Sequence, residues 1–325
     1  MINPKNIEML KRQHYALAGK HSAVKVCEWT KSSLRDEGVC YKEKFYGIKS
    51  AGCCEMSPAA VWCENKCLHC WRAIECTQGD KMSVKLVDDP ITIVEESIKQ
   101  RKKLLTGFKG NSKVDKKVFA KFQEPTHFAI SLIGEPTIYP HIGEFVKEVR
   151  KRGKTSFIVT NGLNPKVLAK LAKQKALPTQ LYVSLNTYNK ENYERWHHSS
   201  KKDAWKRFNQ TLDLLKKLKK KTRTVLRMTI VRHLNMDPEA IKGFAKLIKK
   251  ADPLFVEVKG YISVGYARKR LPYESMPFLD DIADFSKELA KACGLKVLGR
   301  HECSRIVLIG KAKDKKRMKI KKSEI

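Results

Sequence analysis

The sequence predicts an α/β fold in which six βα units form an incomplete barrel behind an N-terminal extension. Apolar residues at consecutive positions, many of them β-branched, are typical of strands buried on both faces of a parallel sheet. Such runs lie at residues 127–133, 156–160, 181–186, 225–231 and 255–264. A sixth strand is expected at 59–62, directly before Cys63. Strand–helix alternation implies right-handed crossovers, and six units are too few for an eight-fold barrel.

Amphipathic stretches between these strands predict helices whose ends are marked in the sequence. Asn164 and Asp237 each precede a proline, which is the pattern of an N-cap followed by a first helical residue. Gly153 is placed to end the helix before it. Long helices are expected at 91–107, 201–221 and 278–292. We divide the chain into an N-terminal extension (1–58), the barrel (59–296), and a C-terminal strand with a basic tail (297–325).

Composition predicts a folded protein without a membrane span. The chain has 325 residues, of which 42% are hydrophobic, and this is enough for a sizeable core. It contains no run of about 18 apolar residues, and its first residues lack the hydrophobic segment of a signal peptide. We therefore expect a cytoplasmic protein, and we expect it to be a monomer.

The charge of the chain favours a nucleic-acid partner. The net charge is +33, of which residues 311–325 contribute +6, so the remaining +27 belongs to the body. Lysine that serves only solubility is the alternative, but an excess this large favours contact with phosphates. Basic stretches at 150–154, 216–223 and 268–270 are candidates for such contacts. Aromatic residues at 193–198 are candidates for stacking on an unpaired base, or form an exposed loop without a role.

The distribution of cysteines points to metal binding. Eight of the ten lie between Cys27 and Cys76, whereas a disulfide scaffold spreads its cysteines through a short secreted chain. Cys63, Cys67 and Cys70 have C-x3-C-x2-C spacing. Three thiolates do not complete a four-coordinate shell, so the motif predicts a metal position left open for a substrate or cofactor. A zinc site completed by a distant ligand is the alternative.

A short polar or glycine-containing segment follows each of several successive predicted strands. After Cys63 to Cys70 come Gly134-Glu135, then Thr160-Asn161, then Asn186 with Thr187. The carboxyl ends of parallel strands meet on one face, where α/β barrels bind their ligands. The series therefore predicts one shared site.

Together these features resemble the radical S-adenosylmethionine superfamily. The resemblance implies that Cys63, Cys67 and Cys70 bind a 4Fe–4S cluster whose fourth iron takes the amino and carboxylate groups of S-adenosylmethionine. It places Gly134 and Glu135 at the methionine amino group and His69 at the adenine. Thr160, Asn161, Ser184 and Asn186 become candidates for the carboxylate and ribose, although Thr160 and Asn161 also suit an ordinary strand-to-helix turn.

A second triplet lies upstream, where Cys27, Cys40 and Cys53 are spaced C-x12-C-x12-C. With the basic body, this pattern resembles the archaeal tRNA 4-demethylwyosine synthases. The resemblance implies a second 4Fe–4S cluster facing the same cavity. It also implies that N1-methylguanosine, beside the anticodon of tRNA(Phe), condenses with two carbons of pyruvate to give the tricyclic base 4-demethylwyosine. The archaeal type lacks a flavin-binding reductase domain, so an external electron donor is implied.

Pyruvate either chelates an open iron or forms a Schiff base with a lysine. Lys42, two residues after Cys40, is the candidate for this catalytic role, and Lys44 is the neighbour most easily confused with it. Cys54 competes with Cys53 as a ligand only at a spacing that the family does not use. Two rival functions remain: another radical enzyme with an auxiliary cluster, and a non-catalytic zinc protein that binds RNA.

Overall fold

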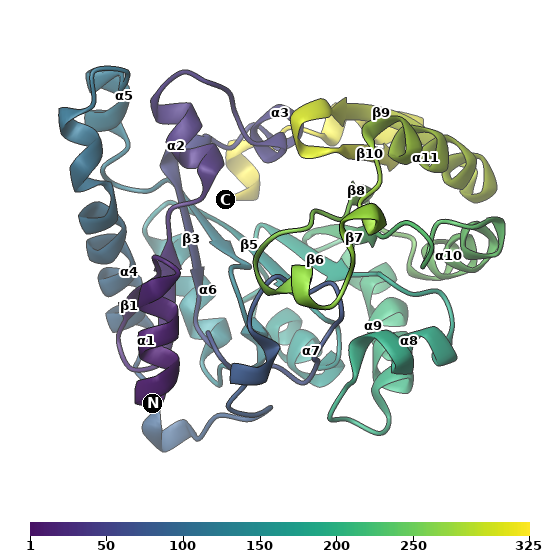
Figure 1. Cartoon of the computed structure of the whole chain (residues 1–325), viewed down its shortest axis with the longest axis horizontal. Helices are drawn as coiled ribbons and strands as arrows, with labels where there is room; N and C mark the ends of the chain where they lie inside the picture. The colour runs from purple at the N-terminus through teal and green to yellow at the C-terminus, as the bar shows by residue number, and fades with distance from the viewer.

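The computed structural model describes residues 1–325, and its ten strands form a single sheet (Figure 1). Six neighbouring strands in the middle of the sheet are parallel and follow chain order. These strands are β3 (Cys53–Ser57), β4 (His127–Ile130), β5 (Thr155–Thr160), β6 (Gln180–Ser184), β7 (Arg223–Ile230) and β8 (Phe255–Gly260). The prediction of six parallel strands in chain order is confirmed.

The position predicted for the first strand is wrong. The strand is β3, and residues 58–61 form a turn between it and Cys63. The apolar run Ala59–Val61 is buried because it packs in a small cluster with Leu132 and Ile133, and not because it pairs with a neighbour. The first parallel strand therefore lies within the predicted N-terminal extension and carries Cys53.

Antiparallel strands extend the sheet on both sides. On one side are β1 (Ala16–Ala18) and β2 (Ser22–Lys25), and β2 pairs with β3. On the other side are β9 (Lys296–His301) and β10 (Ile306–Gly310), and β10 pairs with β8. One C-terminal strand was expected but two are present, because a turn at residues 302–305 folds the segment into a hairpin.

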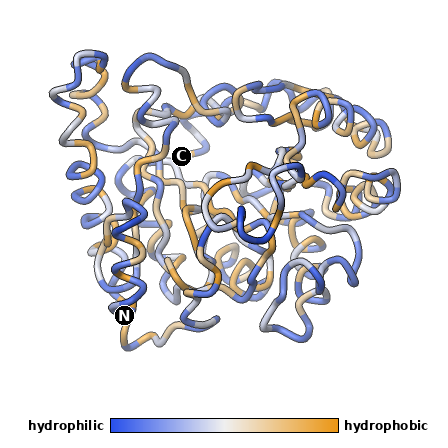
Figure 2. The backbone as a smooth tube through the Cα atoms, in the orientation of Figure 1, coloured by the Kyte–Doolittle hydropathy of each residue, from blue (hydrophilic) through white to orange (hydrophobic).

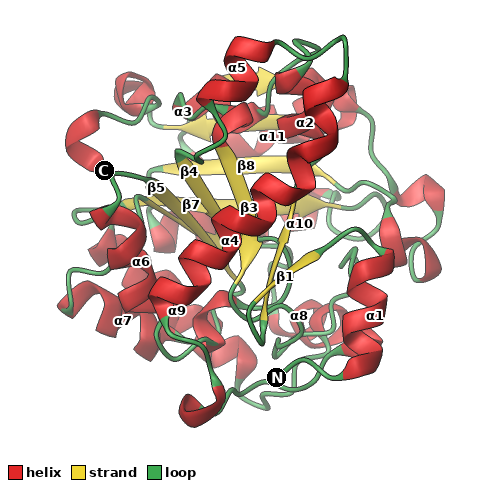
Figure 3. Ribbon diagram, turned by 90° about the vertical axis from the view of Figure 1, so that its left-hand side faces the viewer, coloured by secondary structure: helices red, strands yellow, loops and turns green.

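Helices cover the outer face of the sheet (Figure 3). The largest hydrophobic cluster lies between them and the strands, and Figure 2 shows alternating hydrophilic and hydrophobic turns along these helices. None of them is both long and apolar enough to cross a membrane. The outer helices are α4 (Pro90–Leu105), α6 (Ile142–Lys151), α7 (Pro165–Lys173), α8 (Lys190–His197), α9 (Ala204–Leu218), α10 (Pro238–Ala251) and α11 (Leu279–Cys293). Shorter helices are α1 (Pro4–Arg12), α2 (Glu28–Leu34), α3 (Tyr41–Tyr46) and α5 (Lys116–Lys121).

The three residues predicted at helix ends lie there, but one of them does not cap its helix. Asp237 caps α10 by accepting a 2.7 Å hydrogen bond from the backbone N–H of Ala240. Gly153 follows α6 with a φ of +67°. Asn164 precedes α7 as predicted, but its side chain does not cap the helix. Its amide donates instead to Glu64 and Thr137. The bond to Glu64 joins this turn to residues 63–70, here called the cysteine loop.

Aromatic side chains fill the inner face of the sheet toward the amino ends of its parallel strands. Phe157 packs at 5.6 Å from Tyr182 and at 6.0 Å from Tyr46, which reaches in from α3. Phe255 lies 6.1 Å from the same Tyr46 ring, whose hydroxyl donates to the buried Glu257 at 2.6 Å. Because this end is packed, open space remains toward the carboxyl ends of the strands.

Candidate active site

A cavity of about 400 Å³, here called cavity A, lies at the carboxyl ends of the parallel strands. The structure brings together in its lining all ten residues that the sequence placed at a first cluster and its cofactor. These are Cys63, His69, Cys67, Cys70, Gly134, Glu135, Thr160, Asn161, Ser184 and Asn186. The ten residues therefore line one cavity at the strand ends, and their roles toward a cluster and a cofactor stay a prediction.

Backbone hydrogen bonds to two other segments and one arginine side chain hold the cysteine loop. The Cys63 N–H donates to the Gly79 carbonyl at 2.9 Å, and the Leu68 N–H donates to the Trp196 carbonyl at 3.0 Å. Arg72, which is 7% exposed, donates to the Asn65 carbonyl at 3.0 Å within the loop. Burial alone lowers the pKa of Arg72, but the thiolates of Cys63 and Cys70 outweigh it and raise that pKa.

The donor set of cavity A suits an iron–sulfur cluster. The thiols of Cys63, Cys67 and Cys70 line the same cavity, and cysteine thiolates are the usual ligands of such clusters. Burial raises the pKa of Cys63 to about 12, and it raises the pKa of Cys67 as well. Each thiol must lose its proton to bind iron, so ligation releases protons.

The glycine–glutamate step after β4 crosses directly over the cysteine loop. Gly134 has a φ of +70°, and a Cβ at this position would lie 1.9 Å from the Ala59 carbonyl oxygen, so only glycine fits. The Glu135 carboxylate accepts hydrogen bonds from the Thr160 hydroxyl and the Asn161 N–H, each at 2.7 Å. Burial, followed by the nearby Glu64, raises the pKa of Glu135 to about 7. Hydrogen bonds thus join the Gly134-Glu135 segment to the Thr160-Asn161 segment, and both were predicted at the site.

Other predicted residues lie on the far wall of cavity A. The Asn186 side-chain oxygen accepts from the Thr229 N–H at 2.9 Å, and its amide nitrogen lies 3.2 Å from His69 Nε2. Burial, aided by the cation of Arg270, lowers the pKa of His69 to about 4, so the ring is neutral. The buried Tyr261 hydroxyl has no hydrogen-bond partner although Tyr261 lines the cavity. It is therefore free to meet a polar ligand.

The second triplet lines a smaller cavity of about 230 Å³, cavity B. Cys27 precedes α2, Cys40 precedes α3, and Cys53 is the first residue of β3. Three separate elements thus bring these thiols to one space, and burial raises the pKa of Cys27 to about 12. Cys54 alternates to the other face of β3 and is fully buried in the main hydrophobic cluster, so it does not compete with Cys53.

The structure separates the two candidate lysines. Lys42 is 8% exposed and lines cavity B, with its ammonium 5.6 Å from the Phe157 ring centre and 5.8 Å from that of Tyr182. Lys44 is exposed and is not part of the lining.

Cavities A and B share a wall made of Trp71, Ser131, Arg227 and Lys259. Burial, followed by the cation of Arg227, lowers the pKa of Lys259 to about 8. We did not predict Arg227 or Lys259 as site residues. A signal was available in the sequence, because each is a cation with apolar residues at neighbouring positions of a strand that is mostly buried.

A segment after β8 was also missed, although it closes over the cysteine loop. Arg270 donates to the carbonyls of Leu68 at 3.1 Å and Arg72 at 3.3 Å, and also to the carbonyl of Cys70. The Tyr266 N–H donates to the Trp71 carbonyl at 2.9 Å. Of the basic stretch 268–270, this arginine therefore faces the site and not a phosphate.

The predicted aromatic stacking surface is wrong. Tyr193, Trp196 and His197 are each at most 4% exposed, because α8 turns them into the protein. The Tyr193 ring stacks on His197 at 4.3 Å between ring centres. These rings serve the core beside the cysteine loop and are not accessible to an RNA base.

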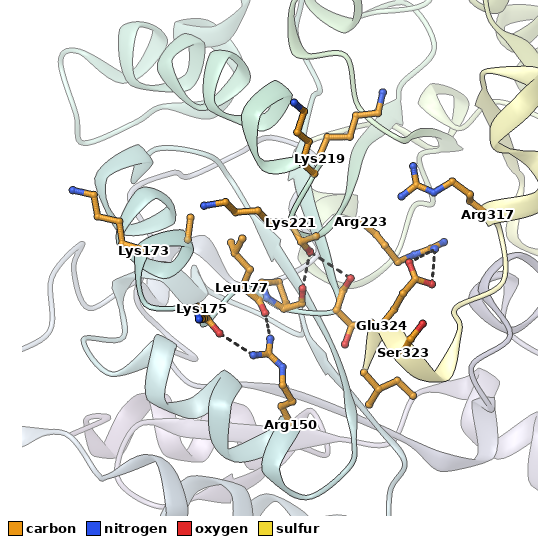
Figure 4. A pocket seen from close by; sticks show the side chains of 16 residues that line it. Arg150, Lys173, Lys175, Leu177, Lys219, Lys221, Arg223, Arg317, Ser323 and Glu324 are labelled. Carbon is orange, nitrogen blue, oxygen red and sulfur yellow. Dashed lines mark hydrogen bonds and ion pairs between the residues drawn. The ribbon is translucent and has the colours of Figure 1, made fainter.

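A further cavity of about 690 Å³ lies at the opposite end of the sheet, near the start of β6 and β7 (Figure 4). Parts of the basic stretches 150–154 and 216–223 meet there. Arg150 donates to the Lys175 carbonyl at 2.8 Å, and the buried Arg223 donates to the Met318 carbonyl at 2.8 Å and pairs with Glu324 at 3.2 Å. These two arginines therefore bind other segments of the protein. In Figure 4 the side chains of Lys173, Lys219 and Lys221 point away from the ion pair.

Comparison with known proteins agrees with this geometry. Residues 58–245 match the family model of the radical SAM superfamily, and residues 250–311 match the model described as wyosine base formation. The S-adenosyl-L-methionine-dependent tRNA 4-demethylwyosine synthase of Pyrococcus horikoshii is 47% identical over 94% of this chain and 89% of its own length. The synthase of Methanocaldococcus jannaschii is 37% identical over 95% and 96%.

Solved structures give the same result. A structure of TYW1 with a lysine–pyruvate adduct bound matches with a TM-score of 0.84 and 35% identity, covering 99% of each chain. A crystal structure of archaeal TYW1 matches with a TM-score of 0.77 and 32% identity, again over 99% of each chain.

Proposed function

The chain belongs to the radical SAM family of tRNA 4-demethylwyosine synthases, and from this premise we propose its substrates. It condenses N1-methylguanosine, next to the anticodon of tRNA(Phe), with two carbons of pyruvate to form 4-demethylwyosine. The observation that carries the proposal is the shared wall between cavities A and B, each lined by three thiols. A radical made in one cavity then meets a carbon donor held in the other.

In cavity A, Cys63, Cys67 and Cys70 would hold a 4Fe–4S cluster. When bound and reduced, the cluster supplies the electron that cleaves S-adenosylmethionine to a 5′-deoxyadenosyl radical. Glu135, Asn161 and Asn186 would present polar groups to the methionine and ribose, and the backbone of His69 would face the adenine. The buried walls exclude water from the radical.

In cavity B, Cys27, Cys40 and Cys53 would hold a second 4Fe–4S cluster beside the pyruvate site. The three thiols and Lys42 line the same small space, which supports this assignment. We interpret the sheet as the incomplete (βα)6 barrel of the superfamily. Residues 1–58 carry these cysteines and include β3, the first strand of the barrel. Residues 59–296 form the rest of the barrel, and 297–325 form the C-terminal strands and tail. We also propose that the protein is a cytoplasmic monomer.

Lys42 would bind pyruvate as a Schiff base. Its neutral amine attacks the ketone carbon, the carbonyl oxygen leaves as water, and an imine remains. Arg227 and Lys259 in the same lining offer cations to the pyruvate carboxylate. The related TYW1 structure with a lysine–pyruvate adduct supports the same chemistry here.

The test is an anaerobic reaction of the cluster-loaded protein with reductant, S-adenosylmethionine, pyruvate and tRNA carrying N1-methylguanosine. Mass analysis of the digested nucleosides should show the tricyclic base. Omitting pyruvate, or supplying tRNA without the methyl group, should remove it. Cleavage of S-adenosylmethionine without a new nucleoside in the complete reaction would contradict the substrates proposed. A colourless protein with stoichiometric zinc would contradict the cluster chemistry itself.

A further inference from the structure

A second groove on the outside of the protein also reaches the cysteine loop. It encloses about 530 Å³ and is lined by Cys63, Glu64 and Lys66, by residues 77–80, and by residues 198–200. Cys63 is the one residue that lines both this groove and cavity A. Cys63 therefore connects the groove to the cavity in which we place the radical-forming cluster.

Backbone hydrogen bonds join both walls of the groove to the cysteine loop. On one wall the Gly79 carbonyl accepts from the Cys63 N–H at 2.9 Å. On the other wall the Ser200 N–H donates to the Glu64 carbonyl at 2.8 Å, and the His197 carbonyl accepts from the Lys66 N–H at 2.8 Å. Both walls thus hydrogen-bond directly to the cysteine loop, so a partner bound in the groove contacts the loop itself.

The charge that the groove shows to solvent is positive. Lys66 in the lining is exposed and makes no ion pair. The same holds for Lys81, next in sequence to Asp80 of the lining, and for Lys202, two residues after Ser200 of the lining. The two acidic side chains of the lining already have partners within the protein. Asp80 pairs with Lys201 at 2.9 Å and accepts from Ser200, and Glu64 is 2% exposed and accepts from Asn161 and Asn164. The uncompensated cations favour an acidic partner.

We propose that this groove is the docking site of an acidic one-electron carrier protein with a low-potential flavin or iron–sulfur centre. The inference rests on the proposed function, because that chemistry consumes one electron per cleavage. In the transfer the carrier is oxidised by one electron and the cluster held by Cys63 is reduced by one. No atom changes place. Docking at the groove brings the donor centre to the outer face of the cluster without opening cavity A.

The test compares reduction by a protein donor with reduction by a small one. Reduced flavodoxin, which is acidic, and dithionite are each mixed anaerobically with cluster-loaded protein, and the bleaching of cluster absorption is followed by stopped flow. In the variant Lys66→Glu/Lys81→Glu/Lys202→Glu, the flavodoxin rate should fall by roughly tenfold or more, because electrostatic steering is lost. The dithionite rate should not change. The variant Lys81→Glu/Lys202→Glu leaves the cysteine loop itself unaltered and should show part of the same loss.

A matched charge reversal on α10 and α11, Lys242→Glu/Lys246→Glu/Lys291→Glu, should leave both rates near those of the unaltered protein. Zero-length cross-linking should join flavodoxin carboxylates to Lys66, Lys81 or Lys202, and this readout does not require turnover. Equal flavodoxin rates in the groove and control variants would overturn the proposal. So would groove variants that lose tRNA affinity in filter binding but keep the flavodoxin rate, because the groove would then be an RNA surface. Failure to make the tricyclic base, with the rate difference retained, would count against the proposed substrates and not against the docking site.

Discussion

The two cysteine triplets reach similar surroundings by different routes. Cys63, Cys67 and Cys70 belong to one short loop, which neighbouring segments pin through its backbone. Cys27, Cys40 and Cys53 begin three separate elements, and only the folded extension brings them together. The first site is local in the sequence and the second is a product of tertiary structure. The local site should therefore tolerate disturbance of the N-terminal extension, whereas the other should not.

The cavities differ in chemistry as well as in construction. Cavity A is lined by amides, several hydroxyls and the carboxylate of Glu135, which suit a large polar cofactor. Cavity B is smaller and adds Lys42 and Glu55 to the two cations of the shared wall; its three cations suit a small oxyacid. The shared wall explains why one reaction needs both: neither cavity alone offers groups for a radical source and a carbon donor.

The largest effect expected is the loss of S-adenosylmethionine cleavage when Cys63, Cys67 and Cys70 are all changed to Ala. No thiolate then remains to hold the first cluster, so cleavage should fall to the rate without enzyme, and about half of the iron should be lost. Iron analysis and assay of 5′-deoxyadenosine measure the two quantities. Retained cleavage would refute the assignment of cavity A.

Changing Cys27, Cys40 and Cys53 to Ala tests the second triplet in the same way. We expect about half of the iron to be lost again, but some cleavage to survive because cavity A is intact. The tricyclic base should not form. Its normal formation would remove the second triplet from the mechanism.

Lys42→Arg keeps the cation of cavity B but removes the amine that forms an imine. Borohydride reduction in the presence of pyruvate should add the mass of a reduced pyruvate adduct to the unaltered protein, and the adduct should map to Lys42. The variant should show no such mass, whereas the control Lys44→Arg should show it undiminished because Lys44 lies outside the cavity. An adduct that moves with Lys44 would reverse our assignment.

The sequence predicted what repeats or clusters along the chain. The five later parallel strands were placed within a few residues because each is a buried run of apolar residues, and the polar steps after them marked the carboxyl-end face. The first strand was misplaced because the run at 59–62 is apolar for a different reason: it is a buried turn. Composition alone does not distinguish buried strand from buried turn.

Contacts between distant residues were beyond the reach of the sequence. Arg270 looked like one cation in a basic stretch, but it binds carbonyls some 200 positions away. Tyr193 and Trp196 looked like an exposed aromatic motif, but α8 buries both against its neighbours. For the second triplet, spacing alone did not show that three thiols converge; a family resemblance supplied the idea, and three separate elements supply the arrangement.

Arg270→Lys tests how far the local site depends on a distant segment. A lysine cannot reach three carbonyls at once, and the two hydrogen bonds lost should destabilise the cysteine loop by about 1–3 kcal/mol. Loss of cluster absorption in the presence of an iron chelator should then be several-fold faster. The control Arg268→Lys should change nothing, because Arg268 is exposed and donates only to the nearby Ser263 carbonyl. Unchanged cluster loss in Arg270→Lys would show that the loop holds its own shape.

The smallest effect expected is a change in the reactivity of Lys259 with pH. Burial and the cation of Arg227 disfavour its charged form and lower its pKa to about 8. Below pH 8 the side chain is therefore mostly the ammonium, and as the pH rises through 8 it becomes a nucleophilic amine. A lysine without these neighbours makes the same change only near pH 10. Competitive acetylation, read by mass spectrometry from pH 6 to 11, should give Lys259 a midpoint about two pH units below that of a lysine in a short reference peptide. Coincident midpoints would mean that Lys259 stays an ammonium above pH 8 and adds a second lasting cation to that of Arg227 in the shared wall; cavity B would then bind an oxyacid equally well on both sides of pH 8.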